Sequence, residues 1–125
     1  MSEWDYIDDV PFIPIKLIGE KLEIIERGIV DTGARFVVLH EKFAKRLNLE
    51  TVDFTEMTGF GSKKKFTVDL CLLSVEIDKT VEIIQCAVIK EKYYPKRVPW
   101  VVIGRNLLNK FKITLDGRNK KIYLE

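Results

Sequence analysis

The stretch GIVDTGARFVV, residues 28–38, decides the fold that this sequence predicts. It interrupts an apolar segment with Asp31, Thr32 and Gly33 before apolar residues resume at Phe36. A carboxylate that leaves water must find an opposite charge, hydrogen bonds or a proton. An acidic residue at the end of an apolar strand is therefore a candidate for chemistry. The alternative interpretation is an ordinary turn between two strands.

The chain as a whole is suited to a single globular domain, residues 1–125. Of its 125 residues, 46% are hydrophobic and 32% are charged, which is enough to bury a modest core. No apolar run approaches the roughly 18 residues that a membrane span requires. The opening MSEWDYIDD is acidic, unlike the basic start of a signal peptide. We therefore expect a cytoplasmic protein that does not bind a membrane.

Charge is unevenly distributed, although the net charge is only +2. Residues 1–60 contain 7 Lys and Arg against 12 Asp and Glu, a net of −5, whereas residues 61–125 contain 14 against 7, a net of +7. A basic half could indicate nucleic-acid binding. The basic residues are, however, scattered through strand-like and turn-like segments, which is typical of solvated loop ends. We expect no nucleic-acid partner.

The two cysteines are too few for a secreted disulfide framework or a zinc site, and we expect neither a metal nor another cofactor. Their positions are still informative. If Asp78 and Lys79 form the two-residue loop of a hairpin, Cys71 lies directly opposite Cys86. We expect two buried thiols in a reducing compartment, with a cross-strand disulfide as the alternative.

Strand patterns account for most of the chain. They occur over residues 11–19, 21–30, 35–39, 51–73, 81–89, 100–104 and 112–125. The segment 51–73 divides into two strands, and the last segment forms a hairpin around Asp116 and Gly117, the strongest turn signal in the chain. Apolar residues at helical spacing over 40–49 and 105–111 predict two short helices. The fold class is therefore all-β.

Three motifs, in this order, resemble the retropepsins, the family of retroviral and retroviral-like aspartic proteases. They are VDTGA at 30–34, TGFGS at 58–62 and VVIGRNLL at 101–108. A lone Asp-Thr-Gly triplet is a weak signal, but the three motifs span roughly residues 12–124 and agree with the strand pattern. The resemblance implies an all-β, retropepsin-like closed β-barrel with one or two short helices, single-lobed and dimerising.

The resemblance also implies that Asp31, Thr32 and Gly33 are the catalytic residues of an aspartic endopeptidase. Peptide hydrolysis by carboxylates requires two of them sharing one proton. Because this chain has one such triplet, the second carboxylate would come from another copy, and the enzyme would be a homodimer acting on a peptide or protein. We expect the pair to lose its protons in two steps, which gives a bell-shaped, acid-leaning rate profile.

Further residues acquire expected roles by the same resemblance. The Thr32 hydroxyl would cross the dimer axis to the partner loop, and Ala34 would line the subsite beside the scissile bond. Gly59, Phe60 and Gly61 would form the tip of a flap that closes over the bound peptide. For the tip, the alternative is an ordinary hairpin turn with one exposed aromatic ring.

One position departs from the retroviral pattern. In those enzymes the second residue after the catalytic glycine is usually acidic and pairs with the arginine after the later glycine. Here the two positions hold Arg35 and Arg105. They would repel each other if adjacent, so either a different acidic partner is recruited or the dimer contacts are arranged otherwise. This departure keeps open an alternative function, a catalytically silent peptide-binding or dimeric scaffold module.

Two other residues carry structural expectations. Gly104 should allow chain segments to approach each other closely beside the active-site loop. His40 is the only histidine, and we expect it to lie in the cap region or on the surface at the start of the first helix. A role as a metal ligand or a general base is the less favoured alternative.

Overall fold

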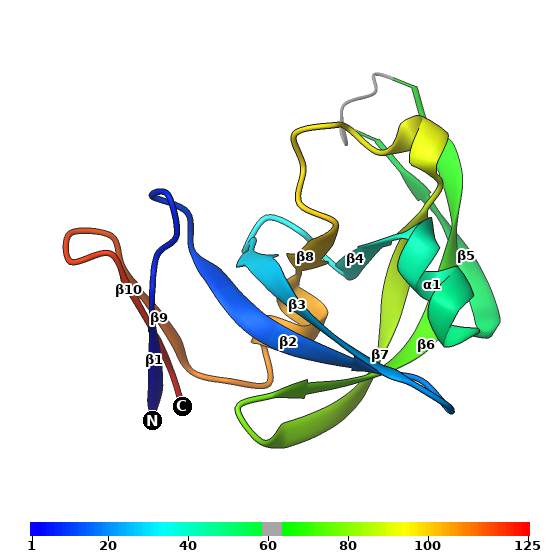
Figure 1. Ribbon diagram of the computed structural model, residues 1–125. Helices are drawn as coiled ribbons and strands as arrows, with labels where there is room; N and C mark the ends of the chain where they lie inside the picture. Colours follow the sequence, from blue (N-terminus) through cyan, green and yellow to red (C-terminus); the bar gives the residue numbers. More distant parts are fainter. Residues whose placement is uncertain (59–63) are drawn as a thin grey trace.

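A computed structural model describes residues 1–58 and 64–125, which form a β-barrel and a small sheet made of the two chain ends (Figure 1). The strands are β1 (Ser2–Asp5), β2 (Phe12–Ile18), β3 (Glu23–Val30), β4 (Val37–His40), β5 (Thr51–Met57), β6 (Phe66–Ile77), β7 (Thr80–Ile89), β8 (Val101–Ile103), β9 (Ile113–Asp116) and β10 (Lys121–Leu124). The helices are α1 (Glu41–Leu47), the 3₁₀ turn η1 (Glu91–Tyr93) and α2 (Arg105–Leu108). Neither α-helix in this part of the chain has the length and apolar content needed to cross a membrane.

The barrel closes through six strands. The sheet has the order β2-β3-β8-β4-β7-β6-β5, and β2 also pairs with β6, so that β5 is left outside the closed ring as an edge strand. The pairs β3–β8 and β4–β7 are parallel, and the other pairs are antiparallel. The predicted all-β closed barrel with two short α-helices is confirmed.

The strands alternate buried and solvent-facing residues, as expected for a sheet with one face on a core. In β2, Ile13, Ile15 and Leu17 are buried and the residues between them are not. Buried side chains form two clusters, and the smaller one contains Val38 and Val102. Segments that flank the Asp31 loop pack against this smaller cluster, so the barrel supports the candidate site directly.

The hairpin β6–β7 has the predicted register. Asp78 and Lys79 form its loop with φ of 48° and 68°, the left-handed conformation that two-residue hairpin loops require. Cys71 consequently pairs with Cys86 across the two strands. Both cysteines are free thiols and buried, with 3% and 0% of their surface exposed. The expectation of two buried thiols is confirmed.

The last hairpin has a longer loop than the Asp-Gly signal suggests. β9 ends at Asp116 and β10 begins at Lys121, so four residues connect the strands. The Asp116 carboxylate accepts hydrogen bonds from the Asn119 backbone N–H at 3.0 Å and from the Asn119 side-chain amide at 2.9 Å. These bonds stabilise the wider loop. β10 also pairs with β1, which places the two chain ends side by side (Figure 1).

His40 caps helix α1 and is buried, with 7% of its surface exposed. Its Nδ1 accepts a hydrogen bond from the Lys42 backbone N–H at 3.1 Å. Its own backbone N–H donates to the Trp100 carbonyl at 3.0 Å, which ties the start of the helix to the segment before β8. The cap position is confirmed, and the surface alternative is wrong because Tyr94 and Trp100 pack against the ring.

Gly104 brings the start of α2 against the segment that follows Asp31. A Cβ atom at Gly104 would lie 2.1 Å from the Phe36 carbonyl oxygen, which no side chain can occupy. Two backbone hydrogen bonds join the same segments, from Arg105 N–H to the Ala34 carbonyl at 2.8 Å and from Asn106 N–H to the Arg35 carbonyl at 3.0 Å. The predicted close approach at Gly104 is confirmed.

The Asn106 side chain extends this contact into the barrel. Its Oδ1 accepts a hydrogen bond from the Val37 backbone N–H at 2.9 Å, and its Nδ2 donates one to the Gln85 carbonyl at 2.6 Å. A single amide thereby connects α2 with β4 and β7. Val37 is fully buried, so its N–H has no access to water if this partner is lost.

Replacing Asn106 with leucine tests this connection. Asn106→Leu keeps the side-chain size but leaves the Val37 N–H and the Gln85 carbonyl without partners, and we expect a loss of about 2–4 kcal/mol in the free energy of unfolding. Urea unfolding at 25 °C measures it. Asn109→Leu, at an exposed position at the end of α2, is the matched control and should change stability by under about 0.5 kcal/mol. Equal losses in the two variants would contradict the assignment.

The paired thiols should be unreactive in the folded protein. Burial raises the pKa of Cys86 to about 12, and burial also raises the pKa of Cys71. At pH 8 roughly one Cys86 in ten thousand is then a thiolate, the form that reacts with disulfide reagents. We expect no reaction with 5,5′-dithiobis(2-nitrobenzoate) before unfolding and two equivalents after unfolding in guanidinium. Rapid reaction of either thiol in the native protein would contradict this burial.

Candidate active site

Asp31 lies at the end of β3, where the chain leaves the barrel. Its backbone N–H donates to the Ile103 carbonyl of β8 at 3.1 Å, and its carbonyl accepts a hydrogen bond from Ala34 N–H at 3.2 Å. Its carboxylate Oδ1 accepts a hydrogen bond from the Gly33 backbone N–H at 2.9 Å. One hydrogen bond thus fixes the start of the loop to β8, and two others hold the loop to itself.

The Asp31 side chain is exposed in the single chain. The apolar flanks of the motif suggest that the carboxylate leaves water. The barrel, however, buries only those flanks and not the carboxylate. Val30 and Val37 are buried, and the loop between them remains at the surface. In one chain, therefore, the carboxylate is solvated and hydrogen-bonded to its own loop, and folding alone removes little of its hydration.

Thr32 and Gly33 complete the triplet. The Thr32 carbonyl accepts a hydrogen bond from Nη1 of Arg105 at 2.9 Å. Its hydroxyl is exposed and has no hydrogen-bond partner within residues 1–58 and 64–125. A Cβ atom at Gly33 would lie 3.2 Å from Asp31 Oδ1, closer than most such contacts, so the absence of a side chain there leaves the carboxylate unobstructed.

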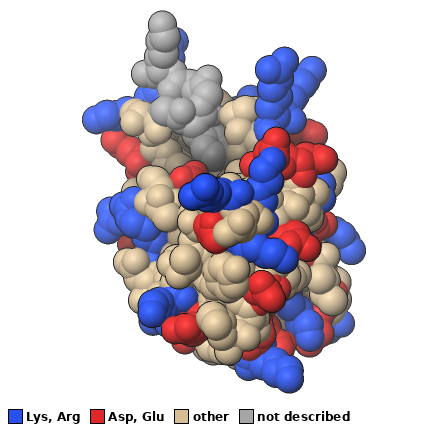
Figure 2. All heavy atoms as spheres, turned by 90° about the vertical axis from the view of Figure 1, so that its left-hand side faces the viewer, with Lys and Arg blue, Asp and Glu red and all other residues tan. Residues whose placement is uncertain are grey.

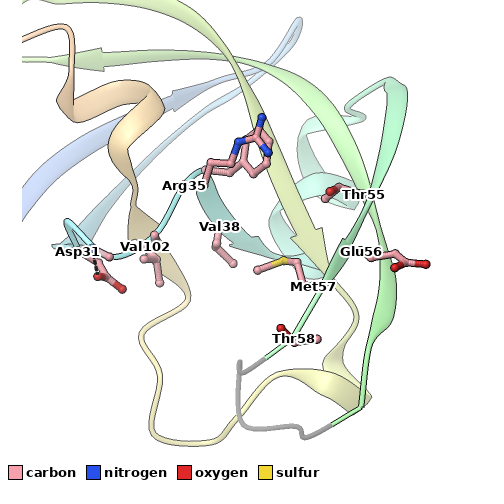
Figure 3. A pocket seen from close by; sticks show the side chains of 11 residues that line it. Asp31, Arg35, Val38, Thr55, Glu56, Met57, Thr58 and Val102 are labelled. Atoms are coloured by element: carbon pink, nitrogen blue, oxygen red, sulfur yellow. Dashed lines mark hydrogen bonds between the residues drawn. The ribbon is translucent and has the colours of Figure 1, made fainter.

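Asp31 forms one wall of a pocket of about 460 Å³ (Figure 3). Val38 and Val102 line it from strands β4 and β8, and Met57 and Thr58 line it from the end of β5. Figure 3 shows Asp31 and Met57 on opposite sides of the space between them. The pocket therefore combines a carboxylate with an apolar surface of a size suited to a peptide side chain.

The structure brings part of the predicted site together. Asp31, Gly33 and Ala34 line the pocket. Thr32 lies in the same loop, but its hydroxyl does not line the pocket. Gly59, Phe60 and Gly61 were predicted to contact substrate, and all three lie outside the described residues.

Several pocket residues were not predicted from the sequence. Val38, Met57, Thr58 and Val102 come from three strands that are distant in the chain. Val38, Thr58 and Val102 lie in the quoted motifs and Met57 in an apolar strand pattern, but neither signal assigns a residue to a pocket. The pairing of β4 with β8 gives two of them this role, since Val38 lies directly opposite Val102.

Arg35 and Arg105 each contact a group other than a carboxylate. Arg105 donates to the Thr32 carbonyl, as described above, and the Arg35 guanidinium carbon lies 5.0 Å from the centre of the Phe36 ring. Neither arginine forms an ion pair with a described carboxylate. Arg105 therefore donates to a backbone carbonyl and not to a different acidic partner, and the other expected alternative, a different arrangement of the dimer contacts, stays a prediction.

Glu56 is the second acidic residue that lines the pocket. It lies on β5 between Thr55 and Met57, and its side chain is exposed. In Figure 3 the Glu56 carboxylate points to the outer side of the strand, away from Asp31. Of the two acidic lining residues, only Asp31 is placed to act on a group held in the pocket.

Solved structures similar to this chain share its fold. A retropepsin-like aspartic protease from Rickettsia conorii is 20% identical, with a TM-score of 0.68, and the match covers 98% of this chain and 88% of that one. The EIAV protease in complex with the inhibitor HBY-793 is 16% identical with a TM-score of 0.55, covering 83% and 89%. The retroviral protease-like domain of Ddi1 from Leishmania major is 14% identical with a TM-score of 0.55, covering 93% and 90%.

The family assignment comes from the sequence itself. A comparison with curated proteins gave no match. The family model described as aspartyl protease matches residues 13–118, which include the Asp31 loop, β5 and the Gly104 contact. With its closed barrel and its retropepsin-like structural neighbours, the chain belongs to the aspartyl protease family and has the retropepsin-like fold.

Proposed function

We propose that this protein is an aspartic endopeptidase that acts as a homodimer, with Asp31 of each copy as a catalytic residue. The observation that carries the proposal is the exposed Asp31 carboxylate at the wall of an apolar pocket, on a loop fixed by hydrogen bonds to β8 and to itself. Membership of the aspartyl protease family supports the same chemistry.

Among its described residues, the pocket of one chain has only one suitably placed carboxylate, which supports the proposal that a second copy is needed. Acid–base hydrolysis by carboxylates requires two of them close together, and Glu56 points away from Asp31 (Figure 3). A two-fold axis between two copies of the loop supplies a second Asp31. The Thr32 hydroxyl, without a described partner in its own chain, is then available to hydrogen-bond with the partner loop.

The proposed reaction needs one proton shared by the two carboxylates. The ionised carboxylate takes a proton from a water molecule as the water oxygen attacks the peptide carbonyl carbon. The protonated carboxyl donates its proton to the carbonyl oxygen, which gives a tetrahedral intermediate. The carboxyl that took the water proton then protonates the leaving nitrogen, the other carboxylate takes a proton from a hydroxyl of the intermediate, and the C–N bond breaks, which restores the original singly protonated pair.

The substrate in this proposal is an extended peptide. β5 is the edge strand of the barrel sheet, so one side of its backbone is unpaired where it reaches the pocket at Met57 and Thr58. An edge of this kind can add a peptide as a further strand. Ala34 lines the same pocket and is proposed to contact the residue beside the scissile bond. A flap at Gly59, Phe60 and Gly61 stays a prediction.

The surface charge and the two buried thiols bear on the expected partner and location. On the face shown in Figure 2, Lys and Arg are interspersed with Asp, Glu and other residues and do not form a continuous basic stripe, which argues against nucleic-acid binding there. The free thiols of Cys71 and Cys86 agree with a reducing compartment, and we keep a cytoplasmic location as part of the proposal.

Replacing Asp31 with asparagine tests the catalytic assignment. Digestion of a peptide library at acid and neutral pH, followed by mass spectrometry, should show cleavage by the parent protein. Asp31→Asn keeps the shape but removes both the base and the acid, so we expect a loss of at least about 10³-fold in rate. Asp78→Asn is the matched control, because Asp78 lies in the exposed β6–β7 loop with φ 48°, which asparagine also adopts readily.

The outcomes separate the candidate functions. Cleavage that persists in Asp31→Asn would contradict the catalytic role of this residue. Binding of peptides without cleavage by the parent protein would favour the alternative, a silent peptide-binding or scaffold module.

Mixing subunits tests whether two copies share one site. The parent chain is unfolded and refolded together with increasing amounts of Asp31→Asn at constant total concentration. Because a mixed dimer carries only one catalytic carboxylate, we expect total activity to follow the square of the parent fraction. A linear dependence on that fraction would show that each chain works alone and would overturn the dimeric site.

A further inference from the structure

Arg35 lines the candidate pocket and has no ionic partner within residues 1–58 and 64–125. It lines the pocket with Asp31, its side chain is exposed, and no described carboxylate forms an ion pair with it. We propose that Arg35 makes the pocket selective for substrates that carry a carboxylate near the scissile bond. This inference rests on the proposed peptidase function, and it names the class of substrate that the same site prefers.

The backbone of Arg35 is fixed, whereas its guanidinium is available. The Arg35 carbonyl accepts the hydrogen bond from Asn106 N–H at 3.0 Å, on the Gly104 contact that anchors the loop. The Arg35 guanidinium carbon lies 5.0 Å from the centre of the Phe36 ring. This contact restricts the rotamers of the arginine without using its N–H donors. A guanidinium that is held in place with free donors is well suited to bind a carboxylate through two hydrogen bonds.

The position of Arg35 predicts where the carboxylate should lie along the substrate. In Figure 3 the Arg35 side chain extends away from Asp31, so its charge lies apart from the proposed catalytic carboxylate. A substrate carboxylate close to Asp31 would be repelled, and one near Arg35 would be attracted. The preference should therefore hold at one substrate position and be absent or reversed beside the scissile bond.

A second pocket is lined by more basic than acidic residues. It measures about 420 Å³ and is lined by Arg27, Lys96 and Arg97, with Glu26 as its one acidic residue. The three cations are exposed and form no ion pair within the described residues. This pocket borders Trp100, next to strand β8, whose Val102 lines the first pocket. Acidic residues further along a substrate would find a positive surface there.

The carboxylate could belong to an acidic side chain or to the C-terminus of the substrate. Both present two carboxylate oxygens to a guanidinium, so the proposal names a carboxylate as the group that is bound. Peptides that differ in only one of these groups distinguish the two sources.

The test compares matched peptides and matched arginine variants. A cleaved peptide from a random library is remade with Glu or Gln at each position in turn, and with a free or an amidated C-terminus. The ratio of kcat/KM within each pair is measured for the parent protein, Arg35→Gln, Arg35→Glu and Arg46→Gln. Arg46 is exposed on α1 and lines no described pocket, so its variant has the same charge change as Arg35→Gln.

We expect the parent protein and Arg46→Gln to prefer one carboxylate-bearing peptide by about five- to tenfold. Arg35→Gln should lose the preference, and Arg35→Glu should reverse it toward the Gln or amidated member of the same pair. The preference should also decrease as salt is raised. A preference for Glu at an internal position identifies a side chain, and a preference for the free C-terminus identifies the terminal carboxylate.

The failure of this inference differs from the failure of the proposed function. Cleavage with no carboxylate preference at any position, or a preference that survives in Arg35→Gln, overturns the role of Arg35 and leaves the peptidase intact. If no peptide is cleaved, the peptidase proposal fails. Peptide binding is then measured by fluorescence anisotropy, with an acidic and an amide peptide pool, on Asp31→Asn and on the double variant that also carries Arg35→Gln. Equal binding of the two pools by Asp31→Asn overturns the proposed role of Arg35.

Discussion

The close approach of Gly104 to the Phe36 carbonyl is the constraint on which the site depends. A Cβ atom there would lie 2.1 Å from the carbonyl oxygen, so any other residue would force the two segments apart. With glycine, the next two backbone N–H groups reach the carbonyls of Ala34 and Arg35. The Arg105 guanidinium then reaches the Thr32 carbonyl. Three successive residues, 104–106, thus contact four of the five residues from Thr32 to Phe36, and these contacts require the close approach at Gly104.

Much of the fold could be predicted because its signals are local. A two-residue loop at Asp78 and Lys79 determines the register of the β6–β7 hairpin, since side chains alternate with a period of two, and Cys71 therefore faces Cys86. The loop after Asp116 could not be predicted in the same way. The Asp116 carboxylate accepts hydrogen bonds from Asn119, which stabilise a connection of four residues. An Asp-Gly pair is compatible with both a two-residue and a four-residue loop. The pairing of β1 with β10 joins opposite ends of the chain and has no local signal.

The residues of the candidate site likewise divide into those with a local sequence signal and those brought together only by the fold. The Asp31 loop could be identified because its residues are contiguous, whereas Val38, Met57 and Val102 meet only after the barrel has formed. The partner of Arg105 was missed for a different reason. Sequence reasoning looks for an acidic side chain opposite a basic one, but any residue has a carbonyl, and Arg105 uses that of Thr32. The hydrogen bonds of Asn106 to Val37 and Gln85 were missed for the same reason, because both partners are backbone groups.

Because Asp31 is exposed in the single chain, folding of the chain does not require its carboxylate to be buried. In one chain the carboxylate is solvated and accepts the Gly33 N–H, so the barrel does not bear the cost of removing a charge from water. In the proposed dimer that cost arises only when two loops meet, where a shared proton reduces the repulsion between the carboxylates. Gly104 and Asn106 therefore contribute to the stability of each chain, whereas Asp31 has its proposed role only between two chains. Under this proposal a chain folds completely before it is competent, and its competence depends on association.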